Sequence, residues 1–223
     1  MGSTGDAPGY CALSTKRGTS MASPTLAGMA ILLQEYLNMG YYPSGFPVAG
    51  DGFDPSGALL KNLLMHSGQA MSIITYDDGT QDSTVSYPSN LQGYGRVQLN
   101  KVVSFGPTGS LSDGSASIYL LGAAYASSNL YRCLPDPNTN ALSHSFTITT
   151  SSESSQPPIR VSLAYTDKPG TANSAVILVN DLSLSLSDTC GGSHTYSPLS
   201  DSDPSLENFE MIVIDHPIPR YAI

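Results

Sequence analysis

Charged residues are scarce in this chain, at 12% of its 223 residues. Basic residues are the scarcer kind, because 9 Lys and Arg face 18 Asp and Glu and leave a formal net charge of −9. Such a chain has no basic stripe that could displace counterions from a phosphate backbone, so we expect no nucleic-acid partner. The acidity is that of a soluble protein, and it would also suit a secreted protein that holds Ca²⁺ through carboxylates and carbonyl oxygens.

Cysteine is also rare, with 3 residues in the chain. Cys11, Cys133 and Cys190 are too far apart for a CxxC zinc or redox pattern. In an extracellular chain, an odd count leaves one disulfide and a free thiol, or a bond to a cysteine elsewhere. Cys133 with Cys190 is the pairing to consider first, since both lie in the later half.

Long apolar runs are absent as well. No stretch approaches the 18 consecutive apolar residues of a transmembrane helix, so we expect no membrane span. The first ten residues, MGSTGDAPGY, also lack the apolar core of a signal peptide.

Two helices are predicted in the first part of the chain. Apolar residues between 20 and 38 recur at spacings of three and four, the period of an amphipathic helix. Pro24 fits only near the start of that helix, and Gly40 suits its end. A second helix is predicted from Pro55 and Ser56 to Gly68. The predicted buried faces are Leu26, Met29, Ala30, Leu33 and Leu37 in the first helix, and Leu59, Leu60, Leu63 and Leu64 in the second.

The pattern changes after the second helix. Residues 69–105 indicate loops, with turns at 77–79 and at Gly93-Tyr94-Gly95, and a domain boundary is predicted near Phe105-Gly106-Pro107. Beyond it, residues 146–148, 159–165 and 182–186 alternate with the period of two that is typical of half-buried strands. We therefore predict one domain over 1–105 and an all-β sandwich over 106–223.

A single segment carries most of the chemical information. Gly18-Thr19-Ser20-Met21-Ala22-Ser23-Pro24, followed by Ala27-Gly28, resembles the nucleophile motif of subtilisin-like serine proteases, G-T-S-M-A-[ST]-P-x-x-A-G, at every fixed position. The plainer interpretation makes Ser20 a helix N-cap, which would explain the serine but not its neighbours. Gly18 would let a substrate backbone pass closely, Ala22 is small, and the start of a helix favours a developing negative charge.

The resemblance implies the roles of individual residues. Ser20 would be the catalytic nucleophile and would give its own backbone N–H to the oxyanion hole, while Gly18 and Thr19 would contact the substrate backbone. A polypeptide substrate, no cofactor for catalysis, and a secreted or extracytoplasmic location are implied by the same likeness.

The remaining catalytic groups do not follow in the order that the resemblance requires. Proteases of this kind place the aspartate and the histidine before the serine. Only 19 residues precede Ser20; none is histidine, and Asp6 is the one carboxylate among them. We therefore expect a C-terminal part of a protease, inactive alone, whose partner is a missing N-terminal part of the catalytic domain. The histidines that follow Ser20 are His66, which we expect to meet carbonyls or solvent at a helix end, and His144, His194 and His216.

Weaker likenesses extend over the rest of the chain. Residues 93–97, GYGRV, resemble a segment near the end of subtilisin-like catalytic domains. Residues 161–167, 178–182 and 206–208 are similar to the C-terminal jelly-roll domain of one branch of these proteases. The implied fold is an α/β catalytic-domain remnant, made of the nucleophile helix and the helix after it, followed by an all-β jelly roll.

Two further possibilities remain open. Asp167, Asp181 and Glu207 could approach a structural Ca²⁺ site in the β-rich half, although scattered carboxylates are usually surface groups. The chain could also be a non-catalytic, degenerate relative of these proteases whose β-sandwich recognises protein or carbohydrate. In that case its serine motif would be inherited and unused.

Overall fold

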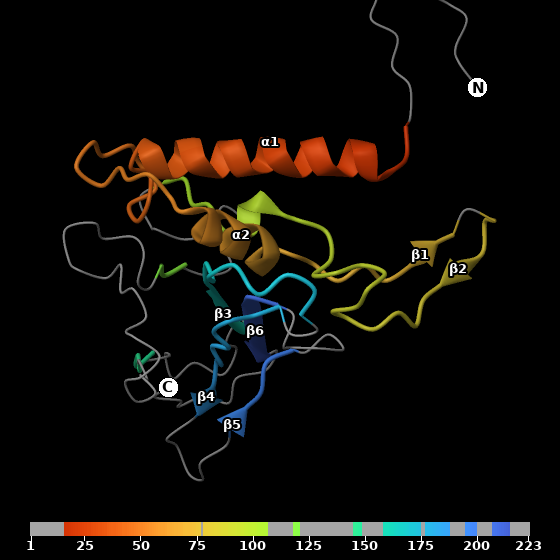
Figure 1. Cartoon of the computed structure of the whole chain (residues 1–223). Helices are drawn as coiled ribbons and strands as arrows, with labels where there is room; N and C mark the ends of the chain where they lie inside the picture. The colour runs from red at the N-terminus through yellow and green to blue at the C-terminus, as the bar shows by residue number, and fades with distance from the viewer. Residues whose placement is uncertain are drawn as a thin grey trace, which may run out of the picture.

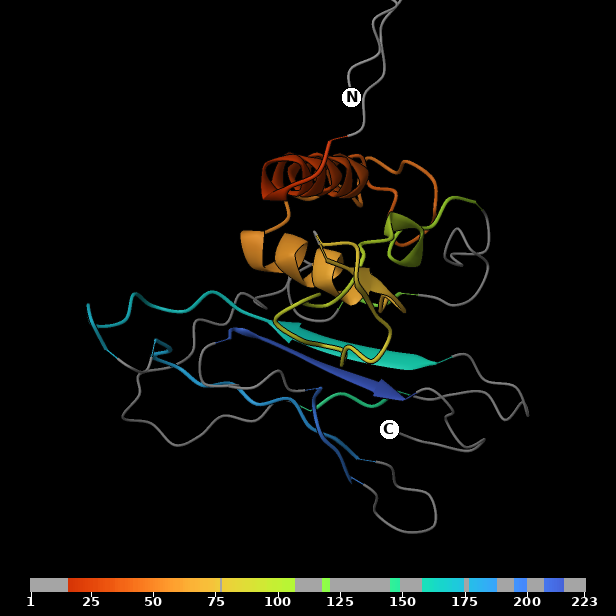
Figure 2. The same ribbon diagram turned by 90° about the vertical axis from the view of Figure 1, so that its right-hand side faces the viewer.

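The computed structural model describes residues 16–76, 78–106, 118–120, 145–148, 158–174, 177–187, 195–199 and 207–214. Two helices come first and antiparallel strand pairs follow (Figure 1). In Figure 2, α1, α2, the β3–β6 pair and the β4–β5 pair lie one below the other. The elements are α1 (Thr19–Asn38), α2 (Gly57–His66), β1 (Ile74–Thr75), β2 (Gln81–Asp82), the 3-10 helix η1 (Leu99–Lys101), β3 (Ile159–Ala164), β4 (Leu186–Ser187), β5 (Thr195–Tyr196) and β6 (Phe209–Ile214).

Helix α1 confirms the first predicted helix to within one residue at its start. Pro24 lies inside the helix, not in its first turn, so it offers no N–H to the carbonyl of Ser20. One residue later, the hydroxyl of Thr25 donates to the carbonyl of Met21 at 2.8 Å. The proline therefore loosens the backbone bonding of α1 directly behind Ser20.

Helix α2 also starts where the sequence predicts. Ser56 is its N-cap, and the Ser56 hydroxyl accepts from the N–H of Leu59 at 3.2 Å. Such a cap satisfies one of the N–H groups that have no partner inside the helix.

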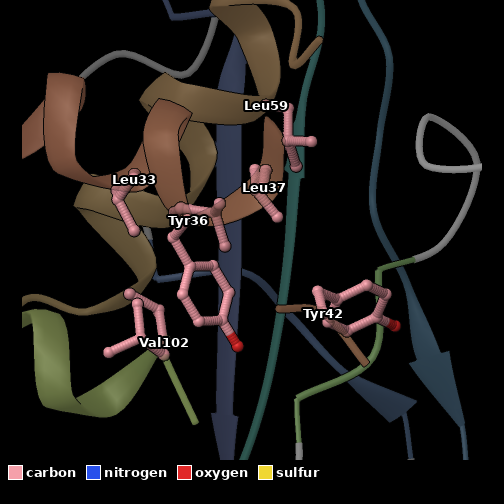
Figure 3. Close-up of a cluster of buried hydrophobic side chains, with 8 residues drawn as sticks. Leu33, Tyr36, Leu37, Tyr42, Leu59 and Val102 are labelled. Atoms are coloured by element: carbon pink, nitrogen blue, oxygen red, sulfur yellow. The ribbon is translucent and has the colours of Figure 1, made fainter. Parts of the chain in front are cut away.

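The larger buried cluster joins α1 and α2 to the segment after η1 (Figure 3). Tyr36 fixes this junction, because its hydroxyl donates to the carbonyl of Ser104 and accepts from the Ser104 N–H, both at 3.1 Å. Of the predicted apolar faces, Leu33 and Leu37 of α1 and Leu59 and Leu63 of α2 are buried. The buried members are Leu33, Tyr36, Leu37, Tyr42, Leu59, Leu63, Val102 and Val103.

Strands β3 and β6 pair antiparallel, with Val161 opposite Ile212 and Ser162 opposite Met211. One face of β3, with Ile159 and Val161, packs into a second cluster around the buried residues Leu186, Ile212 and Ile214. The other face, with Arg160 and Ser162, contacts α2 through hydrogen bonds. The predicted strand is confirmed to within one residue, and all its residues are partly buried, as expected of a half-buried strand; its polar face contacts α2.

The other predicted strands are only partly seen. Residues 146–148 and 182–185 are not strands, and only Leu186–Ser187 pairs, with Thr195–Tyr196. The jelly roll and the boundary near residue 106 stay predictions. Contacts do cross that boundary: Lys61 donates to the side chain of Asn208, and the Tyr94 hydroxyl donates to Glu207 at 3.2 Å.

Candidate functional site

Ser20 is the second residue of α1. The N-cap position is held by Gly18, whose φ of 134° and ψ of 162° suit glycine, and no side chain caps the helix. The interpretation of Ser20 as a simple N-cap is therefore wrong. A glycine is needed at position 18 for the backbone itself, which also leaves the approach to Ser20 without a side chain.

The start of α1 is open to solvent. Gly18, Thr19 and Ser20 are all exposed, and no hydrogen bond from another described residue occupies the N–H or the hydroxyl of Ser20. The N–H groups of Met21 and Ala22 both donate to the carbonyl of Gly18, at 3.0 and 3.2 Å. Unpaired N–H groups at a helix start carry partial positive charge, so this end suits a developing oxyanion.

The first half of α1 is apolar but has little packing. Leu26, predicted to be buried, is 41% exposed, whereas Leu33 and Leu37 are 1% exposed. A helix with apolar residues on several sides normally lies inside a protein. The exposed large apolar side chains of α1 are Met21 and Leu26 in this half and Ile31 and Leu32 in the other.

His66 is the one histidine among the described residues, and it is bound elsewhere. Its Nδ1 lies 2.7 Å from the Ser162 hydroxyl oxygen, and that hydroxyl donates to Oδ1 of Asn62 at 2.6 Å. Since the hydroxyl proton is used, Nδ1 of His66 is the donor. Burial, and then the positive charge of Arg160, lower the pKa of His66 from 6.5 to about 4.

His66 is partly buried, and its Nδ1 meets the Ser162 hydroxyl where a helix carbonyl or solvent was expected. The guanidinium of Arg160 donates to the carbonyl of His66 at 3.1 Å and to that of Gly68 at 2.7 Å. A cation at this end of a helix is favourable, and arginine takes that role here. Asp6, His144, His194, His216 and the three cysteines lie outside the described residues, so their expected roles stay predictions.

Two of the three carboxylates considered for calcium, Asp167 and Glu207, accept hydrogen bonds from protein donors. Asp167 accepts from the backbone N–H groups of Lys168, Val179 and Asn180 and from the Asn180 side chain. Although desolvation acts in the opposite direction, these hydrogen bonds lower the pKa of Asp167 to about 2. Glu207 accepts from Tyr94. In the described ranges, no three His, Cys, Asp or Glu side chains gather where they could hold a metal ion, and the Ca²⁺ site stays a prediction.

Sequence reasoning missed the polar cluster between α2 and β3. Asn62, Arg160 and Ser162 were assigned no role, although Arg160 and Ser162 share one face of a predicted strand. Two polar residues at that spacing indicate a polar face, and nothing in the sequence says that a helix covers it.

No helix in the described part of the chain is long and apolar enough to cross a membrane.

Comparison with known proteins supports a link to proteases. The chain is 30% identical over 204 residues to the serine protease/ABC transporter B family protein tagD of Dictyostelium discoideum, covering 83% of this chain and 11% of that protein. The tagA protein of the same name and organism is 28% identical over 176 residues, covering 78% of this chain and 8% of the relative. The names point to a protease-related family, and the chain spans about a tenth of the length of these curated relatives. No family model and no solved structure matches the chain.

Proposed function

We propose that this chain is the nucleophile-bearing part of a subtilisin-like serine endopeptidase, in which Ser20 forms the acyl-enzyme during peptide-bond hydrolysis. The observation that carries the proposal is the GTSMASP motif at an exposed helix start, where Gly18 is the N-cap and Ser20 is free of other described residues. Relatives named serine proteases support the same conclusion.

In this mechanism the Ser20 hydroxyl attacks the peptide carbonyl, and the N–H of Ser20 stabilises the oxyanion. The C–N bond then breaks, the amine leaves with the proton taken from the hydroxyl, and water hydrolyses the acyl-enzyme. Gly18 and Thr19 line the path of the substrate backbone. A histidine must take the hydroxyl proton, and His66 is engaged with Ser162. We therefore propose that the aspartate, the histidine and an oxyanion-hole asparagine come from a further part of the catalytic domain, without which this chain is inactive.

The exposed apolar side chains of α1 fit this arrangement. Met21 and Leu26 in the first half of the helix and Ile31 and Leu32 in the second are exposed, and they would be covered by the same part that supplies the missing catalytic groups. Secretion of the full enzyme and a jelly-roll domain after residue 105 belong to the same proposal.

Hydrolysis of a protein substrate tests the proposal, using this chain and a chain extended with the preceding part of the catalytic domain. We expect activity only in the extended chain, and Ser20→Ala should lower its turnover by roughly 10⁴ to 10⁶. Ser23→Ala, three residues along the same exposed helix, is the matched control and should remain active.

Two results would contradict the proposal. The first is hydrolysis by the 223-residue chain alone, lost in its Ser20→Ala variant. This result would show that the chain needs no further part of the catalytic domain. An extended chain that folds but does not hydrolyse protein would favour the non-catalytic binding module.

A further inference from the structure

Hydrogen bonds cross the domain boundary that the sequence predicts near residue 106, and Ser162 of β3 makes several of them. Its hydroxyl donates to Oδ1 of Asn62 at 2.6 Å and accepts from Nδ1 of His66 at 2.7 Å. The amide of Asn62 also donates to the Ser162 carbonyl at 3.3 Å. One serine of β3 is therefore bonded to two side chains of α2 that lie one helical turn apart.

A second contact completes the end of α2. The guanidinium of Arg160 donates to the carbonyl of His66 at 3.1 Å and to that of Gly68 at 2.7 Å. The last carbonyls of a helix have no partner inside the helix, and a cation is favourable beside them. The start of α2 is capped by Ser56, which directly precedes it, whereas its end depends on an arginine of β3, 94 positions after His66.

Further contacts reach the start of β6. The ammonium of Lys61 on α2 donates to the side chain of Asn208, which directly precedes β6. In the turn after α2, the hydroxyl of Tyr94 donates to Glu207 at 3.2 Å. The ring of Tyr94 also meets the buried ring of Phe209 edge-on, with the two centroids 4.8 Å apart. Both strands of the pair are therefore bonded to the helical part of the molecule.

Helix α2 lies between α1 and the β3–β6 pair (Figure 2). Its apolar side packs on α1, where Leu59 and Leu63 share a buried cluster with Leu33 and Leu37. A helix of 10 residues is marginal in water by itself, so α2 depends on the elements that cover it. If the β3–β6 pair moved away, polar groups of α2 would lose their partners.

We propose that the β3–β6 pair is a structural brace of α2 and not a separately folding unit, so that α2, β3 and β6 unfold together. The brace fits in one register, because Arg160 and Ser162 are two positions apart on β3 and meet the end and the middle of α2. Independent domains that merely touched would open separately. The brace does not depend on Ser20 being catalytic.

Amide exchange of the wild-type full chain tests the brace without any variant, when it is measured in urea below the unfolding transition. We expect the amides of α2, β3 and β6 to approach one opening free energy with the same dependence on urea. Opening of β3 and β6 at lower urea, while α2 stays protected, would overturn the proposal. An absence of protection in all three elements would also overturn it, since every residue of the brace lies in this chain.

The variant Ser162→Ala tests whether the interface carries the coupling. It removes the hydroxyl that bonds to both Asn62 and His66. We expect amide exchange in α2, β3 and β6 to rise by the same factor, roughly 10-fold. Ser187→Ala, at an exposed position of β4 in the same β-rich half, is the matched control and should leave all three unchanged. A rise confined to β3 and β6, or no rise at all, would contradict the brace.

A double-mutant cycle of Asn62→Ala and Ser162→Ala gives an independent check through urea midpoints. Both residues act through the same contact, so the double variant should lose less stability than the sum of the two single losses. Additive losses would show that this contact does not join α2 to β3 energetically, and the proposal would fail.

Discussion

The two halves of α1 differ in what their sequence indicates and in how deeply their side chains are buried. The first half, residues 19–28, carries the motif that indicates a function, and all of its residues are exposed. The second half carries no motif, and Leu33, Tyr36 and Leu37 are among the most buried residues of the chain. The half of α1 with the recognisable motif is therefore not the half that packs against the other described residues. Three comparisons of variants test this contrast between exposed and buried positions.

The largest expected effect comes from a matched pair of leucines on α1. Leu37→Ala should lower the free energy of unfolding by about 2 to 5 kcal/mol, because it leaves a cavity among packed side chains. Leu26→Ala, on the same helix, should change it by no more than about 0.5 kcal/mol. Urea denaturation of both variants measures the difference, and equal losses would show that the first half of α1 is packed after all.

A smaller effect is expected at the end of α2. Arg160→Met removes two charged hydrogen bonds to helix carbonyls, and we expect a loss of about 2 kcal/mol. Lys168→Met, an exposed cation in the loop after β3, should be nearly neutral in the same denaturation experiment. Removing Arg160 should also raise the pKa of His66, so an unchanged pKa would contradict the role assigned to this charge.

The smallest effect separates two serines at helix starts. Ser56→Ala should lower the free energy of unfolding by about 1 kcal/mol, since Ser56 caps α2. Ser20→Ala should leave it almost unchanged, because Gly18 holds the cap position of α1. Thermal denaturation of the two variants is sufficient, and a destabilising Ser20→Ala would restore a structural role for that serine.

Sequence patterns located the local elements well. The period of the apolar residues placed α1 and α2, and Ser56 marked the start of α2, because these signals depend only on neighbouring residues. Gly95 in the predicted turn has a φ of 77°, and a Cβ there would lie 2.1 Å from the carbonyl oxygen of Gln69. The sequence predicted a turn at this point, and the structure shows why the turn requires glycine.

Contacts between distant segments were not predictable in the same way. The polar face of β3 was expected to face solvent. The residues around Arg160 and Ser162 in the sequence do not indicate that Asn62 and His66 contact them. The exposure of Leu26 was also missed, because periodicity shows which residues share a face and not what covers that face. Ser20 was identified by its resemblance to a known motif. Only the structure shows that no other described residue hydrogen-bonds to its hydroxyl.

Labelling with a fluorophosphonate tests the central claim most directly, because the reagent reacts with an activated serine and intact mass counts the adducts. On a chain extended with the preceding catalytic part, we predict one adduct, located at Ser20 and absent from Ser20→Ala. The 223-residue chain should remain unlabelled. An adduct at another residue of the extended chain, or an unlabelled Ser20 in an extended chain that is folded, would contradict the account.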